Sequence, residues 1–374
     1  MPIGSDKGNF IKPGFLPLTL APTTVGLLAW GWNNYGELGQ GNTTDYSSPV
    51  QVGGVTIWDK VGAGAHFTLT TKTDGTLWVW GRNHYGQLAQ GNTTGYSSPV
   101  QVGALLTWDK VTGGEGHTVA TKTDGTLWTW GYNAQGQLGH GNTTNISSPV
   151  QVGALTNWSK IACGANYTAS VKTDGTLWTW GQAAFGPLGL GNTTYYSSPK
   201  QVGALTTWLN VSAQYFHTAA TKTDGTLWCW GMGGFGQLGI GNTTYYSSPK
   251  QVGALTTWDT VSCGQYYTVA TKTDGTIWVW GYNGHGNLGQ GNVTNYSSPV
   301  QLGALTTWSK LTCGYIHTIA TKTDGTLWTW GLNDKGQLGD GSTTSLSSPV
   351  QVGALTTWDK ITGGGKFTLA TDSA

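Results

Sequence analysis

Three histidines are the residues whose type could most readily support chemistry, because imidazole can bind a proton or a metal ion near neutral pH. His117, His217 and His317 recur at intervals of 100 residues, each followed by Thr. The same repeat position is otherwise filled by aromatic residues, namely Phe67, Tyr167, Tyr267 and Phe367. A position that accepts phenylalanine does not require a proton-binding nitrogen. We therefore expect these histidines to pack rather than to catalyse a reaction or bind a metal.

The remaining candidates for chemistry are equally sparse. The four cysteines show no C-x-x-C spacing, and three of them share one repeat position that elsewhere holds Gly or Ala: Cys163, Cys263 and Cys313, with Cys229 separate. We expect small buried residues rather than disulfides or a zinc site. No Ser-His-Asp set or carboxylate pair stands out from the repeat. The sequence thus predicts a protein that is not an enzyme, with no catalytic residue, no metal and no cofactor.

The composition of the chain is unusual and limits the structural elements that can position these residues. The chain has 374 residues with 60 Gly and 21 Trp, yet only 9% are charged and the net charge is +1. So few charges argue against a nucleic-acid partner and against a polybasic membrane-surface protein. No run of about 18 apolar residues occurs, so membrane insertion is not expected.

A 50-residue repeat explains this composition. The dipeptide Trp-Gly recurs without insertion or deletion from Trp30 to Trp330, which makes seven units. A period near 50 is typical of propellers and solenoids. Because β-branched and aromatic residues lie between glycines and no stretch has helical periodicity, the unit is predicted to be all-β.

Four strands are expected in each unit. In the third unit they are Asp109–Gly114, His117–Thr123, Thr126–Gly131 and the segment 147–152, running from the inside of a blade outwards. The chain begins the repeat late, at Val25, and ends it early, at Thr371, so each end supplies the half that the other lacks. We therefore predict a single seven-bladed β-propeller over residues 25–374, with four-stranded blades and a composite closing blade built from both termini.

Tryptophan and glycine have separate expected roles in this fold. Twenty of the 21 tryptophans occupy three repeat positions, those of Trp30, Trp58 and Trp78, and should pack between blades. Glycines such as Gly131 and Gly136 should provide left-handed turns and close backbone approach.

The repeat resembles a known family. The run W-G-x-N-x-x-G-Q-L-G-x-G-N, as in residues 130–142, and the run G-x-x-H-T at Gly114–Thr118 are similar to the repeat of the regulator of chromosome condensation family. The resemblance covers residues 25–371 and implies the propeller fold. Members of that family include exchange factors, chromatin binders, enzyme inhibitors and bacterial or viral surface modules, so it implies no single function. The uniform repeats are closest in character to bacterial and phage members.

Comparison of the seven units predicts a binding surface. Variation gathers in the loop after Trp-Gly, around the residues after G-N-T-T, and in the turn before the second strand. In an up-and-down blade these segments lie at one end of the ring, which we call the variable face. It is rich in aromatic and amide side chains, which suit adaptable recognition of proteins and of sugars. The predicted ligand-binding residues are Trp32, Tyr35, Arg82, His84, Tyr85, Tyr96, Tyr132, Gln135, Phe185, Tyr195, Tyr215, Phe216, Phe235, Tyr245, Tyr266, Tyr282, His285, Tyr315 and Lys335.

Residues 1–24 precede the first repeat and are expected to form an extended arm, because four prolines disfavour a helix. No signal peptide is recognised, since Pro13, Gly14 and Pro17 interrupt the apolar stretch. The arm could dock on a structural partner through its apolar residues, which are Phe10, Ile11, Phe15, Leu16 and Leu18.

These features favour a recognition or structural propeller that binds a protein or glycan through the variable face and is tethered by its arm. A virion or cell surface is the expected location, with the cytoplasm as the other possibility. Two alternatives follow from the resemblance: a guanine-nucleotide exchange or chromatin-type regulator, and a proteinaceous enzyme inhibitor.

Overall fold

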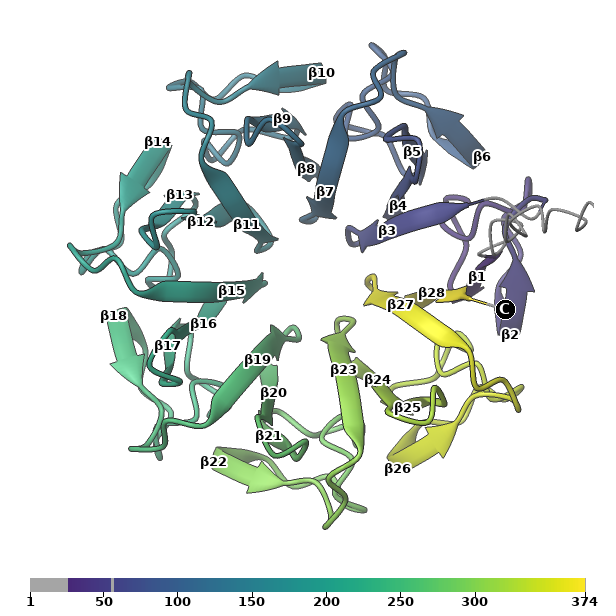
Figure 1. Cartoon of the computed structure of the whole chain (residues 1–374), viewed down its shortest axis with the longest axis vertical. Coiled ribbons are helices and arrows are strands. Elements are labelled where there is room, and N and C mark those ends of the chain that lie inside the picture. The colour runs from purple at the N-terminus through teal and green to yellow at the C-terminus, as the bar shows by residue number, and fades with distance from the viewer. Residues whose placement is uncertain (1–25, 55–56, 374) are drawn as a thin grey trace, which may run out of the picture.

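The computed structural model describes residues 26–54 and 57–373, which form a closed ring around a central channel (Figure 1). These residues contain seven antiparallel sheets of four strands each, and no helix. The all-β fold, the seven blades and the four strands in each blade are confirmed.

Every blade has the same order of strands from the channel to the rim. The innermost strands are β3 (Trp58–Ala63), β7 (Trp108–Gly113), β11 (Trp158–Cys163), β15 (Trp208–Gln214), β19 (Trp258–Cys263), β23 (Trp308–Cys313) and β27 (Trp358–Gly363). The second strands are β4 (Phe67–Lys72), β8 (His117–Lys122), β12 (Tyr167–Lys172), β16 (His217–Lys222), β20 (Tyr267–Lys272), β24 (His317–Lys322) and β28 (Phe367–Asp372).

The two outer strands of each blade follow the same scheme. The third strands are β1 (Gly26–Gly31), β5 (Leu77–Gly81), β9 (Leu127–Gly131), β13 (Leu177–Gly181), β17 (Leu227–Gly231), β21 (Ile277–Gly281) and β25 (Leu327–Gly331). The rim strands are β2 (Tyr46–Gln51), β6 (Tyr96–Gln101), β10 (Ile146–Gln151), β14 (Tyr196–Gln201), β18 (Tyr246–Gln251), β22 (Tyr296–Gln301) and β26 (Leu346–Gln351).

The closing blade joins the two ends of the described chain. Its strand order is β2-β1-β28-β27, and β1 pairs with β28 from Gly26↔Asp372 to Gly31↔Phe367. The N-terminal segment therefore supplies the two outer strands and the C-terminal segment the two inner ones. This arrangement is the predicted composite blade, and it gives the closing sheet the same four strands as the other six.

A tight turn sets the hairpin between the second and third strands. Asp124 Oδ1 accepts hydrogen bonds from the Thr126 backbone N–H at 3.0 Å and from the Thr126 hydroxyl at 2.7 Å, while Gly125 adopts a φ of +78°. Only glycine takes that backbone conformation without strain. A Cβ on Gly125 would also collide with the carbonyl of Thr156 in the next connection. The Asp-Gly pair thus fixes the hairpin and the path of the neighbouring linker together.

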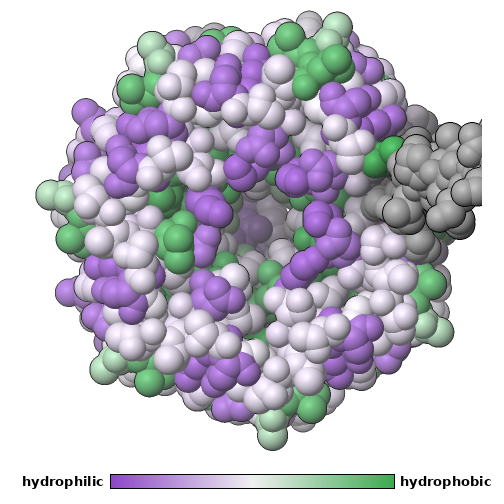
Figure 2. Space-filling view, viewed as in Figure 1, coloured by the Kyte–Doolittle hydropathy of each residue, from purple (hydrophilic) through white to green (hydrophobic). Residues whose placement is uncertain are grey.

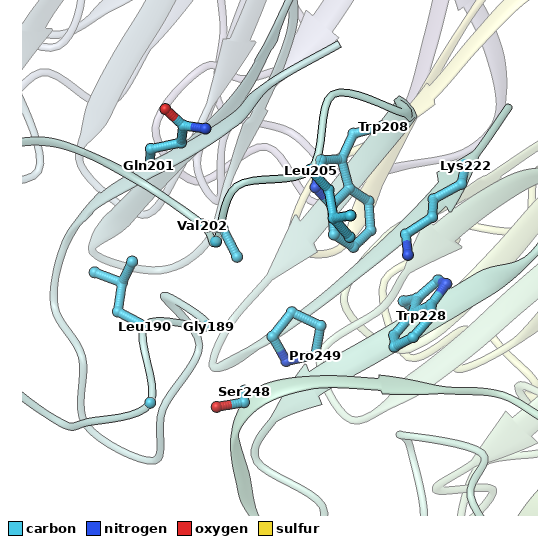
Figure 3. A pocket seen from close by; sticks show the side chains of 12 residues that line it. Gly189, Leu190, Gln201, Val202, Leu205, Trp208, Lys222, Trp228, Ser248 and Pro249 are labelled. Carbon is cyan, nitrogen blue, oxygen red and sulfur yellow. The ribbon is translucent and has the colours of Figure 1, made fainter.

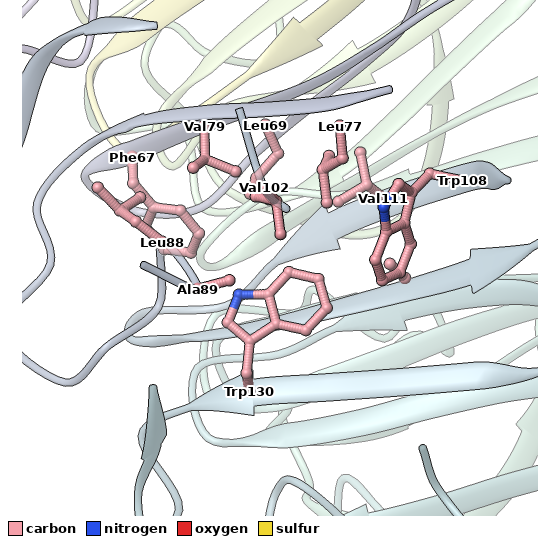
Figure 4. Packing of buried hydrophobic residues seen from close by; sticks show 11 residues of the cluster. Phe67, Leu69, Leu77, Val79, Leu88, Ala89, Val102, Trp108, Val111 and Trp130 are labelled. Atoms are coloured by element: carbon pink, nitrogen blue, oxygen red, sulfur yellow. The ribbon is translucent and has the colours of Figure 1, made fainter. Parts of the chain in front are cut away.

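Tryptophan fastens one blade to the next. Trp130 is fully buried against Leu88, Ala89 and Val102 of the preceding blade (Figure 4). Its Nε1–H donates to the carbonyl of Gln87 at 2.8 Å, so the contact between blades is both apolar and hydrogen-bonded. The rings of Trp108 and Trp130 meet edge-on at 5.8 Å. The Trp128 set packs on the same clusters but remains only partly buried.

The other predictions on the chain have mixed outcomes. All four cysteines are buried and free of disulfides, as expected. In the part of the chain that the structure describes, no helix has the length and apolar character needed to cross a bilayer. The predicted arm residues Phe10, Ile11, Phe15, Leu16 and Leu18 lie outside the described residues.

Hydrophilic residues surround the mouth of the central channel at the end of the ring seen in Figure 2. Within the channel, Lys60, Lys110 and Lys160 line a cavity of about 300 Å³. Lys60 and Lys110 each pair with the adjacent aspartate, at 2.7 and 2.6 Å. The positive charges of Lys60 and Lys110 are therefore largely neutralised by their neighbouring carboxylates.

Candidate functional site

Strand registers place the variable loops at one end of the ring. Gly81 is opposite both Phe67 and Tyr96, so the end of β5 and the starts of β4 and β6 lie together. Trp58 is opposite Lys72 at the other end of the same blade. The variable face is thus a real surface, although its role in binding remains a prediction.

Buried polar side chains hold the loop after Trp-Gly from within. Asn83 Nδ2 donates to the carbonyls of Asn92 and Thr94 at 3.1 and 2.8 Å, and its Oδ1 accepts from the Leu88 N–H at 2.9 Å. Gln87 Oε1 accepts from the Tyr85 N–H at 2.9 Å. These bonds satisfy the backbone of an irregular loop and fix the residue at its tip, so that Tyr85 is presented on a rigid support.

Two loops lack the asparagine and keep the same course. Ala183 and Gly233 take its place, and the turn is retained by Gly186 N–H donating to the Ala183 carbonyl at 2.8 Å. In the first of these loops Phe185 has a φ of +69°, which is uncommon for a residue with a side chain. Its ring is 42% exposed. Strained, exposed aromatic residues of this kind are concentrated at binding sites.

A first aromatic cluster spans the closing blade and the two blades that follow it. Trp32 and Tyr35 both contact His66, at centroid distances of 4.8 and 5.6 Å. The Arg82 guanidinium lies over the rings of Tyr35 and Tyr85, at 5.6 and 5.7 Å. The cluster consists of Trp32, Tyr35, His66, Arg82, His84, Tyr85 and Tyr132.

A second aromatic cluster is larger and spans the blades β11–β14, β15–β18 and β19–β22. Phe185 contacts Phe216 and Tyr245 edge-on at 5.2 and 5.5 Å, and Tyr215 contacts Tyr266 at 5.1 Å. Aromatic contacts connect all of its members, which are Phe185, Tyr215, Phe216, Phe235, Tyr245, Tyr266, Tyr282 and His285. Eight rings from three blades therefore form one continuous surface.

The innermost loops are joined around the channel by backbone hydrogen bonds between neighbouring blades. Six blade junctions have such a bond, for example Glu115 N–H to the Ala165 carbonyl at 3.1 Å and Gln265 N–H to the Tyr315 carbonyl at 2.8 Å. In the described residues the junction between β15–β18 and β19–β22 has none. There Tyr215 adopts a φ of +48°, and its N–H is bonded by the Gln214 side chain at 3.1 Å. The interruption lies within the second aromatic cluster.

On the variable face, ionisable groups with shifted pKa values lie in the first cluster and at the channel mouth. Glu37 is fully buried, and desolvation raises its pKa to about 7, while its Oε2 accepts from the Tyr35 N–H at 2.8 Å. Burial lowers the pKa of His66 to about 4, so the imidazole is neutral at pH 7. The two side chains approach at 3.8 Å. Burial likewise raises the pKa of Glu115, with the positive charge of Arg82 opposing the shift.

Ion pairs mark a third, charged sector of the variable face. Lys335 pairs with Asp45 at 3.3 Å, and Lys366 pairs with Asp334 at 2.6 Å. These pairs bridge the β23–β26 blade and the closing blade. The variable face is thus divided into two aromatic clusters and one charged sector.

Several predicted residues lie apart from the clusters. Tyr96 begins strand β6 and packs on a core cluster, with its hydroxyl accepting from Asn92 Nδ2 at 3.2 Å. The position that varies is one residue earlier, where Tyr195 and Tyr245 are each 45% exposed. Tyr315 lies at the channel mouth, where burial raises its pKa, and Gln135 occupies a loop tip.

Sequence reasoning missed Glu37 and His66 as site residues. The only signal for Glu37 was a carboxylate at a repeat position that holds glutamine in four units. His66 belonged to a variable turn but was not selected.

The repeated histidines do not form a site. His117, His217 and His317 are buried, and each Nε2 lies 3.0–3.2 Å from a threonine hydroxyl of the next blade. At the equivalent position Tyr167 donates its hydroxyl to the His217 carbonyl at 2.7 Å. The packing role expected for these residues is confirmed.

Comparisons with known proteins agree with this architecture. A family model described as the RCC1-like domain matches residues 110–374, and the regulator of chromosome condensation (RCC1) repeat matches residues 26–70 and 74–121. No curated protein matches the sequence.

Solved structures share the fold at low sequence identity. Human WBSCR16 is 21% identical with a TM-score of 0.83, and the match covers 93% of this chain and 98% of that one. Prp20p from Saccharomyces cerevisiae, described with its binding to Gsp1p and histones, is 17% identical with a TM-score of 0.83 and coverages of 94% and 92%. Yeast RCC1 (Prp20) in complex with Kap60 is 16% identical, with a TM-score of 0.82 and coverages of 98% and 95%.

Proposed function

Because this chain belongs to the RCC1-like domain family, we propose that it is a protein-recognition propeller whose partner docks on the variable face. The single observation that carries the proposal is the second aromatic cluster, a continuous surface of eight rings from three blades. Rigid aromatic rings bury much apolar area on binding and lose little conformational entropy.

The support for the cluster comes from the loops beneath it. Hydrogen bonds from buried polar groups fix the loop tips, as for Phe235, whose N–H donates to Gln237 Oε1 at 2.9 Å. A preorganised surface avoids much of the ordering cost that weakens association. Similarity to structures of proteins in complex with, or described by their binding to, other proteins is consistent with a protein ligand.

The test is affinity capture with matched variants. Alanine at Tyr215, Phe216 and Tyr245 should remove proteins that the wild type captures, as identified by mass spectrometry. A control variant carries alanine at Leu105 and Leu106, which are exposed at the opposite end of the ring. Retention of every partner by the folded cluster variant, or equal loss in the control, would contradict the proposal.

A second candidate is a guanine-nucleotide exchange or chromatin-type regulator. It is favoured by the extent of the match to Prp20p, which is described with its binding to Gsp1p and histones. Stimulated release of labelled GDP from a small GTPase, or retention of core histones on the immobilised protein, would support it. Absence of both activities at micromolar protein would exclude it. Location on a virion or cell surface, and inhibition of an enzyme, remain predictions.

A further inference from the structure

A second kind of surface feature repeats around the ring, away from the variable face. Cavities of about 440, 450 and 400 Å³ lie at three successive blade junctions. We call each a junction groove. The groove in Figure 3 is formed by Leu205 from one blade and by Trp208, Lys222, Trp228, Ser248 and Pro249 from the next.

The floor of the groove is aromatic. Trp208 and Trp228 meet edge-on with centroids 6.3 Å apart, and Trp228 keeps part of its surface exposed. An indole face carries partial negative charge and attracts the weakly positive C–H groups on one side of a pyranose ring. Pro249 and the exposed Leu205 add apolar walls, so the groove suits a flat ligand with one apolar face.

The polar groups of the groove include donors that lack acceptors. Trp228 Nε1–H donates to the Thr226 hydroxyl at 2.9 Å, and Asp224 accepts from Thr226 at 2.6 Å, so these groups are already satisfied. Trp208 is only 3% exposed, and its buried Nε1–H has no acceptor. A buried donor without a partner is costly and is normally matched by a water molecule or a ligand.

The lysine contributes a charged donor to the groove. Lys222 is 7% exposed, and its Nζ lies 3.8 Å from the centre of the Trp228 ring. Nζ also lies 4.9 Å from the centre of the Trp208 ring, and within the described residues it makes no ion pair or hydrogen bond. An ammonium group that faces an open groove and has no anionic partner favours a ligand that brings negative oxygen atoms.

The sequence repeats this set six times and alters it once. The lysine and the exposed tryptophan recur together as Lys72/Trp78, Lys122/Trp128, Lys172/Trp178, Lys222/Trp228, Lys272/Trp278 and Lys322/Trp328. In the closing blade the corresponding residues are Asp372 and Leu28, and Asp372 accepts a hydrogen bond from Thr357. The chain therefore contains its own control, a seventh junction that keeps Trp358, whose Nε1–H also lacks an acceptor, but has neither the lysine nor the exposed tryptophan.

We propose that the three junction grooves, and the three other junctions with the same lysine and tryptophan, bind acidic glycans, with the carboxylate of a uronate or sialate at the lysine and its ring against the exposed part of the tryptophan and the adjacent proline. Each groove is open and shallow, so a single sugar should bind weakly. Six equivalent sites around one rim would convert weak single-site binding into strong retention on a polymer or a coated surface.

The first experiment measures the class of ligand. Glucuronate and N-acetylneuraminate are titrated against the whole chain by isothermal calorimetry, with glucose and lactose as neutral counterparts. The expected result is saturable binding of one or both acidic sugars with about six sites, and at least tenfold weaker binding of the neutral sugars. No binding of acidic sugars at tens of millimolar, or equal binding of neutral ones, would overturn the proposal.

The second experiment assigns the sites. A single-groove variant, Trp228→Leu with Lys222→Asp, copies the residues of the seventh junction and should reduce the stoichiometry from six to five. Replacing all six lysines with methionine keeps the apolar stems and should abolish retention on a polyuronate column. An unchanged stoichiometry in the single-groove variant would overturn the assignment even if the sixfold variant failed to fold. So would loss of sugar binding in the Tyr215, Phe216 and Tyr245 alanine variant, which instead tests the protein-binding face.

Discussion

Glu37 places a carboxyl group at a buried repeat position where the next blade has the amide of Gln87. Gln87 Oε1 accepts the Tyr85 N–H at 2.9 Å, and Glu37 Oε2 accepts the Tyr35 N–H at 2.8 Å in the same way. The second oxygen, Glu37 Oε1, is buried without a hydrogen-bond partner. An amide would keep the useful bond and avoid burying a charge, with its Nε2 left unpartnered as Gln87 Nε2 is.

The variant Glu37→Gln should therefore be more stable than the wild type above neutral pH. The folded carboxyl group has a pKa of about 7 against an ordinary value of 4.5. The unfolded chain thus loses its proton first, and the stability contributed by the neutral group falls as pH rises from 4.5 through 7. We expect a gain of about 2–3 kcal/mol at pH 8 and a small effect at pH 4.

Urea unfolding of both proteins at pH 4, 6 and 8 measures this difference. Gln87→Glu is the matched control, because it should introduce the same pH-dependent loss in the next blade. A gain for Glu37→Gln that is the same at all three pH values would contradict the assigned cause.

At the scale of the strands and loops, tryptophan is the main connection between blades. Trp130→Ala should cost about 3–5 kcal/mol, as for other buried large aromatic residues. Trp130→Phe keeps most of the apolar contact but loses the bond to the Gln87 carbonyl, which then keeps only the Thr118 hydroxyl at 2.8 Å. We expect that variant to cost about 1–2 kcal/mol.

Circular dichroism during urea unfolding gives both values. Leu106→Ala, at a residue that is 61% exposed, should change stability by less than about 0.5 kcal/mol. Equal losses for the phenylalanine and alanine variants would mean that the hydrogen bond, rather than packing, dominates the junction.

Some features of the strands and loops could be predicted from the sequence and others could not. Strand order and hairpins were predictable because the signals are local and recur seven times, as with Asp124-Gly125. Tyr96 was grouped with the variable loop residues because neighbouring positions were merged, and the register places it in β6. Tyr215 could not be singled out, because its positive φ and the bond missing at its junction arise only when neighbouring blades are in place. The junction grooves were also missed, since their residues are fixed in the repeat and were attributed wholly to packing.

For the whole molecule, closure of the ring depends on the pairing of β1 with β28. Leu27 is opposite Thr371 in the closing blade, and Leu127 is opposite Thr121 in an ordinary blade. Replacing both residues of either pair with cysteine removes one leucine and one threonine at equivalent positions of the sheet. The closing disulfide encloses nearly the whole chain, whereas the control encloses a loop of a few residues.

The oxidised closing pair should therefore stabilise the protein more than the oxidised control pair, by about 3 kcal/mol on chain-entropy grounds. Comparing the oxidised and reduced forms of each variant by urea unfolding cancels the cost of the substitutions. A gain no larger than that of the control would contradict the chain-entropy origin of the stabilisation.

The interrupted junction at Tyr215 gives the ring a built-in seam. Within the described chain, six pairs of neighbouring blades share a backbone bond between their innermost loops, whereas the blades β15–β18 and β19–β22 lack it and keep the outer bond from Gly241 N–H to the Ser297 carbonyl at 2.8 Å. The junction keeps its other bonds, such as Trp280 Nε1–H to the Gln237 carbonyl at 2.9 Å, but it has one backbone bond fewer than the other six, and it runs beneath the largest aromatic cluster. A partner that contacts aromatic rings of the second cluster on both sides of this junction would connect the two blades. Such binding should reduce opening of the ring as a whole. Amide hydrogen exchange should therefore slow also in blades that the partner does not contact.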